Sequence, residues 1–157
     1  MGSGKSALGK QLANLLHSNF VDMDELFEQR YHLSIYDFFG KYGEDNFRKI
    51  ERELLIETIN LENTVISTGG GTPCFYDNMS FIRDSGISVY LRMTSGELTQ
   101  RLKTVKKKRP LIKEMPAESL EEWISVQLIY RETYYLQANF IFYPLTEDIR
   151  DLALRLG

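Results

Sequence analysis

The amino-acid sequence predicts an α/β fold in which helices cover both faces of a parallel β-sheet. Four short apolar runs have the length of strands, and stretches with helical spacing of apolar residues separate them. Strands that alternate with helices in this way form parallel sheets. The chain has 157 residues, is 43% hydrophobic and shows no repeat or linker. We therefore expect a single domain over residues 1–157, built around one core.

The first element is a glycine-rich loop that leads into a helix. The opening MGSGKS matches the second half of the phosphate-binding motif G-x-x-x-x-G-K-[ST], with Gly4, Lys5 and Ser6 in its last three positions. Leucines at helical spacing follow over residues 5–17, although a plain glycine turn before a helix would look similar. Because a phosphate loop follows a buried strand, we expect about ten further residues to precede Met1.

The remaining elements follow from local patterns. We expect strands in NFVDMD, ENTVISTGGG, GISVYLRM and NFIFYP, and helices over residues 24–59 with a break near Gly40 and Gly43, 77–85, 95–104, 118–136 and 146–156. A strand ahead of the phosphate loop would bring the parallel sheet to five strands.

Two predicted strands end in residues suited to ligand binding. Asp22 and Asp24 stand two apart, so on a strand both carboxylates would point beyond the carboxyl edge of the sheet, where open α/β sheets bind ligands. One carboxylate could then serve a metal ion and the other a hydroxyl group, although Asp24 also resembles a helix cap. The run STGGGTP leaves backbone open to the close approach of a ligand, but a flexible turn is the alternative.

Two arginines and one cysteine have less distinctive surroundings. Arg48 stands three residues before Glu51 on a predicted helix, which by itself favours a surface ion pair. Arg131 lies among tyrosines, on which it could simply stack. Cys74 is the sole cysteine, and neither histidine is near it in sequence, so we expect a small buried residue rather than a nucleophile.

A basic segment and the overall charge limit the possible partners. The segment TVKKKRPLIKEMP is polar and closed by two prolines, which is typical of a mobile lid, here over about residues 104–118. Its four adjacent positive charges, residues 106–109, could instead bind nucleic acid, but the net charge of −3 argues against nucleic-acid and membrane partners. The sequence shows no signal peptide and no apolar run near the ~18 residues of a membrane span. With one cysteine, this predicts a cytoplasmic protein.

In combination, these motifs resemble one known family. The order GSGKS, DMD, FR in a helix, STGGGTP, RP in a basic segment and YRETYY is similar to that of the shikimate kinases over the whole chain. The resemblance implies a three-layer α/β/α P-loop kinase fold with a central five-stranded parallel sheet and a mobile lid. It also implies that ATP and Mg²⁺ are used to phosphorylate the 3-hydroxyl of shikimate, a step toward chorismate and the aromatic amino acids. We further expect a monomer.

For the nucleotide side of the site, the resemblance implies a group of residues that bind ATP and its metal ion. They are Met1, Gly2, Ser3, Gly4, Lys5, Ser6, Ala7, Arg101 and Arg109. Lys5 would contact the β- and γ-phosphates, and Ser6 would bind Mg²⁺ directly while Asp22 binds it through water. Arg109 would approach the transferring phosphate from the lid and offset its charge in the transition state.

For the acceptor side, the resemblance implies a pocket within and around the helical region of residues 24–59. Its members are Asp24, Phe39, Phe47, Arg48, Glu51, Gly69, Gly70, Gly71 and Arg131. Arg48 and Arg131 would bind the substrate carboxylate, for which arginine suits better than lysine. Asp24 would hold the acceptor hydroxyls as candidate base, and with Lys5 and Arg109 it completes the expected catalytic set.

Three alternatives remain from the sequence. Gluconate kinases and nucleoside monophosphate kinases share the loop and the lid, but DMD, GGG and two arginines fit a carboxylated polyol ring better than a nucleobase. A non-catalytic nucleotide-binding module would bind ATP without acceptor-dependent turnover. A nucleic-acid binder using the basic segment would show steep salt dependence.

Overall fold

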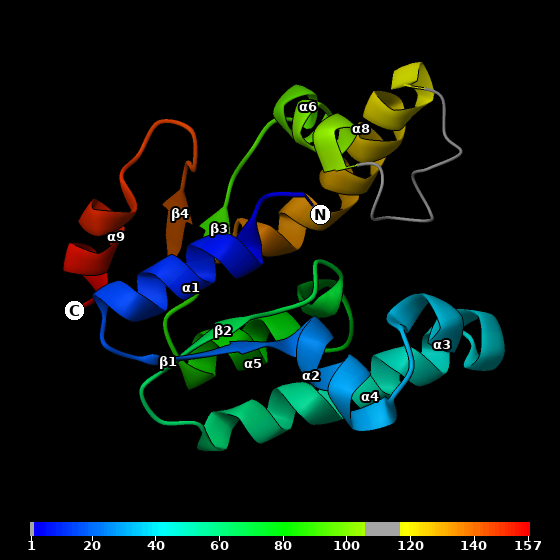
Figure 1. Cartoon of the computed structure of the whole chain (residues 1–157), viewed down its shortest axis with the longest axis horizontal. Helices are drawn as coiled ribbons and strands as arrows, with labels where there is room; N and C mark the ends of the chain where they lie inside the picture. Colours follow the sequence, from blue (N-terminus) through cyan, green and yellow to red (C-terminus); the bar gives the residue numbers. More distant parts are fainter. Residues whose placement is uncertain (1, 106–116) are drawn as a thin grey trace.

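Four short strands in two parallel pairs form the centre of the fold (Figure 1). The computed structural model describes residues 2–105 and 117–157. The strands are β1 Asn19–Asp22, β2 Thr64–Ser67, β3 Val89–Leu91 and β4 Phe140–Phe142. In the first pair Asp22 lies opposite Ser67, and in the second Leu91 lies opposite Phe142. All four predicted strand runs therefore contain strands, and both pairs are parallel as predicted.

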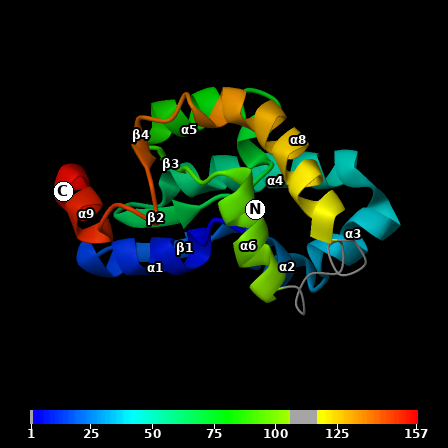
Figure 2. The same ribbon diagram turned by 90° about the horizontal axis from the view of Figure 1, so that it is seen from above.

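Helices precede, connect and follow the strands. Their bounds are α1 Lys5–Leu15, α2 Met23–Tyr31, α3 Ile35–Tyr42, α4 Glu44–Glu57, α5 Asn78–Ser85, α6 Ser95–Val105, α8 Ala117–Tyr135 and α9 Ile149–Leu156, with 3-10 turns η1 Thr58–Asn60 and η2 Thr72–Cys74. In Figure 2, α1 lies on one side of β2, and α4 and α5 lie on the other. Helices thus cover both faces, as predicted.

The helical region of residues 24–59 has one more break than predicted. The expected break occurs at Gly43, whose φ of 80° separates α3 from α4. The additional break follows His32, which ends α2 in the left-handed conformation with φ of 51°. Ser34 then caps α3 by accepting a hydrogen bond from the Asp37 N–H at 3.0 Å. The result is a compact three-helix unit rather than two longer helices.

Three apolar clusters hold these elements together. The first joins α2, α3 and α4 and contains Met23, Phe27, Phe38, Phe47, Leu54 and Leu55. The second joins α6 to α8 and contains Met93, Leu98, Leu102, Leu120 and Ile124. The third joins α1 to α9 and β4 and contains Leu12, Phe142 and Leu152. Each set of helices that carries predicted site residues is therefore anchored by its own cluster.

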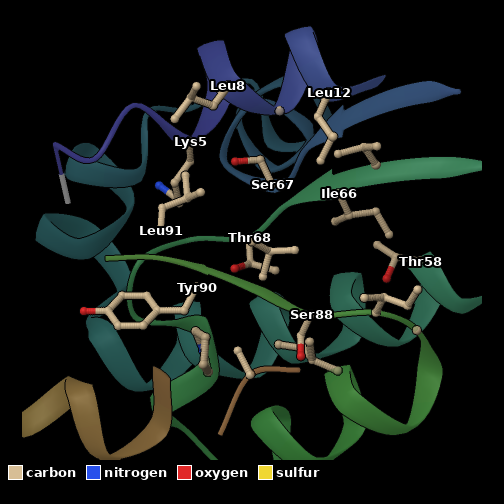
Figure 3. Close-up of a pocket in the computed structure, with 18 of the residues that line it drawn as sticks. Lys5, Leu8, Leu12, Thr58, Ile66, Ser67, Thr68, Ser88, Tyr90 and Leu91 are labelled. Carbon is tan, nitrogen blue, oxygen red and sulfur yellow. The ribbon is translucent and has the colours of Figure 1, made fainter. Parts of the chain in front are cut away.

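A cavity of about 680 Å³ is lined by both strand pairs. In the described residues, β2 and β3 are not hydrogen-bonded to each other, and the walls include Ile66 of β2, Leu91 of β3 and Leu12 of α1 (Figure 3). The Ser67 hydroxyl, which lines the same cavity, is buried and has no hydrogen-bond partner among the described residues. The described residues thus supply four of the five expected strands.

No helix within residues 2–105 and 117–157 has the length and apolar character needed to cross a membrane.

Candidate active site

The phosphate loop has a backbone shape that depends on its glycines. Gly2 and Gly4 adopt φ of 75° and 85°, a region that L side chains rarely occupy. A Cβ at Gly2 would also lie 2.9 Å from Leu102 Cγ. Gly4 is the N-cap of α1, so the first N–H groups of that helix face the loop together with the positive end of its dipole. This arrangement is suited to binding a phosphate group.

Ser6 and Asp22 bring two oxygen ligands together beside the loop. The Ser6 hydroxyl donates a hydrogen bond to Asp22 Oδ2, which joins the first turn of α1 to the end of β1. Asp22 is buried, and its other oxygen, Oδ1, caps α2 by accepting from the N–H groups of Asp24 at 3.0 Å and Glu25 at 3.4 Å. Hydroxyl and carboxylate oxygens are ligands that Mg²⁺ prefers.

Two sequence-based interpretations of the DMD motif were wrong. Strand β1 ends at Asp22, so Asp24 lies in the first turn of α2 and does not share a strand face with Asp22. The helix cap is Asp22 rather than Asp24. The strand stops because the Asp22 side chain bonds the N–H groups of the next turn and starts the helix there.

Arg101 lies against the phosphate loop, on the nucleotide side where the sequence placed it. Its Nη1 donates to the Ser3 carbonyl oxygen at 3.0 Å, and a Cβ at Gly4 would lie 3.0 Å from its Nη2. Ser3 is buried by this packing, whereas Ala7 is exposed on α1. Met1 and Arg109 lie outside the described residues. So does the predicted lid, except for the helix ends at residues 104–105 and 117–118.

On the acceptor side, Arg48 is buried between two carboxylates. Its Nη1 donates to Glu51 Oε2 at 2.7 Å, while its Nη2 and Nε donate to Glu44 Oε1 at 2.7 and 3.1 Å. Arg48 is 8% exposed and Glu51 4%, so the alternative of a surface ion pair was wrong. Burial by itself would lower the pKa of Arg48, but the contacts with Glu51 and Glu44 outweigh it and leave the pKa raised.

Aromatic rings surround the Arg48 guanidinium. Its Cζ lies 5.9 Å from the ring centre of Phe39, 5.1 Å from that of Phe47 and 4.1 Å from that of Phe75. Phe39 and Phe47 meet edge to face, with ring centres 4.8 Å apart. A cation over an aromatic face is attracted to it, and more strongly away from water. Phe75 was missed in the sequence analysis, although an aromatic residue directly after STGGGTPC could have indicated it.

Two of the three glycines after β2, Gly69 and Gly71, lie close to charged side chains of the acceptor side. A Cβ at Gly69 would lie 2.7 Å from Glu51 Oε1 and 3.1 Å from Asp24 Oδ1. A Cβ at Gly71 would lie 2.7 Å from Arg48 Nη2. Gly69 and Gly71 are therefore needed for close packing, and the alternative of a plain flexible turn does not account for these two. Asp24, Arg48 and Glu51 thus gather around one loop.

The second arginine approaches the same place from α8. Arg131 Nη2 donates to Gln127 Oε1 at 3.0 Å. Burial raises the pKa of the Cys74 thiol, and both Arg131 and Arg48 oppose that shift, so both positive charges lie near Cys74. The raised pKa leaves little thiolate at neutral pH, which agrees with a buried cysteine that is not a nucleophile.

Tyr135, one turn after Arg131 on α8, contacts the glycine loop directly. Its hydroxyl donates a hydrogen bond to the Gly70 carbonyl oxygen, and its ring lies 5.0 Å from that of Tyr90 on β3. Burial raises the pKa of Tyr135, so the hydroxyl keeps its proton and remains a donor. This contact fixes the Gly70 backbone and was missed in the sequence analysis.

These features define a class of protein. A phosphate loop at a helix N-terminus, with serine and aspartate oxygens beside it, indicates a P-loop nucleotide-binding protein, and the arginine and carboxylates gathered around the glycine loop are suited to a small anionic, hydroxylated acceptor. Comparison with known proteins gives the family. The family model for shikimate kinase matches residues 1–153, and the chain belongs to the shikimate kinase family.

Individual relatives agree with this assignment. A shikimate kinase of Parabacteroides distasonis is 42% identical over 157 residues, covering 98% of this chain and 91% of the relative. The crystal structure of shikimate kinase from Bacteroides thetaiotaomicron superposes with a TM-score of 0.92 at 40% identity, covering 99% of this chain and 91% of the other. Shikimate kinase from Acinetobacter baumannii in complex with shikimate superposes with a TM-score of 0.85 at 33% identity, covering 99% and 85%.

The comparisons confirm the predicted α/β P-loop kinase fold and the predicted enzyme class. The chain is an ATP-dependent kinase of the shikimate pathway, which leads to aromatic amino acids.

Proposed function

We propose that this kinase transfers the γ-phosphoryl group of ATP to the 3-hydroxyl of shikimate, using the residues gathered between the phosphate loop and the glycine loop. The observation that carries this proposal is the buried Arg48, which is held rigidly by Glu44 and Glu51 beside Gly71. A fixed guanidinium is suited to orienting a planar carboxylate, which shikimate carries and a simple polyol does not.

On the nucleotide side, the loop of residues 2–7 binds the phosphates of ATP. The first N–H groups of α1 point toward the β-phosphate, and Lys5 neutralises charge on the β- and γ-phosphates. Arg101 supports the loop from α6 through the Ser3 carbonyl oxygen. Arg109 remains a proposal from the family resemblance alone, as the lid residue that stabilises the transferring phosphate.

Ser6 and Asp22 fit a magnesium site. Their oxygens already contact each other beside the loop. The described residues contain no group of three or more His, Cys, Asp or Glu that could hold a metal ion by themselves. This suits Mg²⁺, which is bound by one or two protein oxygens together with phosphate oxygens and water. When bound, Mg²⁺ offsets the negative charge that the phosphates carry during transfer.

On the acceptor side, Arg48 and Arg131 bind the carboxylate of shikimate and Asp24 binds its hydroxyls. Gly69 and Gly71 let Glu51, Asp24 and Arg48 pack directly against the loop, and the backbone of Gly69, Gly70 and Gly71 lies beside the ring of the acceptor. Phe39 and Phe47 shape the pocket through their contacts with Arg48. Asp24 orients the 3-hydroxyl toward the γ-phosphate and accepts its proton during transfer.

Three broader expectations rest on the sequence alone. We propose that residues 1–157 act as a single domain and as a monomer. A cytoplasmic location remains a prediction from the single cysteine.

Acceptor-dependent release of ADP tests the proposal. The protein is supplied with ATP and Mg²⁺ and offered shikimate, gluconate or nucleoside monophosphates in parallel. We expect release with shikimate alone, and we expect Lys5→Ala to abolish it. Folded protein that binds ATP but releases no ADP with any acceptor would contradict the proposal, and so would turnover with gluconate in preference to shikimate.

A further inference from the structure

A buried chain of hydrogen bonds continues beyond the Arg48–Glu51 pair. Glu51 uses Oε2 for Arg48 and Oε1 for the Thr72 hydroxyl, which donates to it at 2.6 Å. Thr72 is 0% exposed. Both oxygens of this buried carboxylate are therefore satisfied by side chains from different elements, α4 and η2.

Thr72 is itself held in place by α5. Asn78 Nδ2 donates to the Thr72 carbonyl oxygen at 2.7 Å, and Asn78 is 0% exposed. Its Oδ1 accepts from Arg52 Nη1 at 2.8 Å, and Arg52 also forms an ion pair with Asp77 at 2.7 Å. The Thr72 N–H adds a bond of 3.2 Å to the Gly69 carbonyl oxygen. The Thr72 hydroxyl is thus attached to a backbone with little freedom to move.

We propose that Thr72, held by Asn78, is a positioning residue that sets the affinity of the site for the acceptor carboxylate. A carboxylate rotates easily about its last side-chain bond. With Oε1 fixed by Thr72, Glu51 presents only Oε2 to Arg48, and this fixes the plane of the guanidinium. The remaining N–H groups of Arg48 then point where the substrate carboxylate binds. This inference rests on the proposed role of Arg48.

Loss of the Thr72 hydroxyl would change the position of Arg48 and would not change the binding of ATP. Glu51 Oε1 would be left buried without this donor, and a buried charged group that loses a hydrogen bond costs free energy of folding. The carboxylate would turn to share both oxygens with Arg48, and the guanidinium would lose N–H groups that the substrate needs. The hydrogen bond that joins Arg101 to the phosphate loop, from Nη1 to the Ser3 carbonyl oxygen at 3.0 Å, is not part of this chain of bonds, so the KM for ATP should not change.

The test is a set of three variants compared by steady-state kinetics. Thr72→Val keeps the shape but removes the donor, and Thr72→Ser keeps the donor. Thr64→Val is the matched control, because among the described residues the Thr64 hydroxyl donates only to the nearby Glu62 carbonyl oxygen, at 2.8 Å. We expect Thr72→Val to raise the KM for shikimate about 10- to 100-fold, which corresponds to the loss of a hydrogen bond to a charged group. The KM for ATP should stay within about twofold, with Thr72→Ser and Thr64→Val close to wild type.

The outcomes separate this inference from the proposed function. An inactive wild type would refute the function, whereas an active wild type and an unchanged KM for shikimate in Thr72→Val would overturn the role of Thr72. Equal rises in the KM for shikimate and the KM for ATP would also overturn the role of Thr72, because they would indicate general loosening of the fold. If Thr72→Val does not fold, Thr72→Ala removes the same donor without placing a methyl group against Glu51, and the same expectations apply.

Discussion

Replacing Gly71 with alanine tests whether the position of the Arg48 guanidinium controls acceptor use. The new Cβ would lie 2.7 Å from Nη2, 2.8 Å from Nη1 and 3.0 Å from Cζ of Arg48, whereas ordinary contact begins at 3.4 Å. The guanidinium would have to retreat by about 0.7 Å. Gly71 has φ of −89°, which alanine adopts without strain, so the effect comes from this contact alone.

The structure leaves the guanidinium little room for that retreat. Glu51 and Glu44 hold it at 2.7 Å, and the ring of Phe75 lies 4.1 Å away. Misplacement of a binding group by about 1 Å lowers activity by up to about 100-fold. We therefore expect Gly71→Ala to reduce kcat/KM for shikimate about 10- to 100-fold and to destabilise the fold by about 1–3 kcal/mol.

The assay is steady-state ADP release at varied shikimate and at varied ATP, with thermal melting of each protein. Gly40→Ala is the control, because a Cβ there meets nothing within 4 Å and the residue lies inside α3. That variant should keep wild-type kinetics and gain about 0.5–1 kcal/mol of stability. Wild-type kcat/KM for shikimate in folded Gly71→Ala would refute the reasoning.

Three further predictions follow from the same geometry. Arg48→Lys should raise the KM for shikimate about 10- to 100-fold at constant KM for ATP, because a point charge replaces a planar guanidinium; equal effects on both substrates would contradict its role. Asp22→Asn keeps a good helix cap but removes a charge beside Ser6, so about tenfold more Mg²⁺ should be needed for half-maximal activity at nearly unchanged melting temperature. Cys74 should react with a thiol reagent at pH 8 much more slowly in the folded protein than in denaturant, because burial raises its pKa and lowers its thiolate fraction; equal rates would show that the thiol is accessible and unperturbed.

Features set by neighbouring residues were predictable from the sequence. The glycine loop before α1 and the four strand runs depend on local spacing, and the structure has them where they were expected. The prediction for the DMD motif was wrong because we extended the alternation of strand side chains past the end of a four-residue strand. Either aspartate of the motif could cap a helix, and here Asp22 is the cap and ends the strand.

Features set by distant segments were not predictable in this way. The spacing of Arg48 and Glu51 is the same for a surface pair and a buried one, and packing against distant residues such as Phe75 and Gly71 decides between them. Thr72 and Glu51 are 21 residues apart, and Tyr135 and Gly70 are 65 apart. Contacts of this range depend on how the helices pack, which a single sequence does not encode in any local pattern.

The cavity between the strand pairs brings residues from both sides of the site to one space. Its lining includes Lys5 from the nucleotide side, Gly69 and Gly70 from the acceptor side and Tyr135, which holds the Gly70 backbone. Through Tyr135, the position of α8 and of the Arg131 that it carries is therefore coupled to the glycine loop.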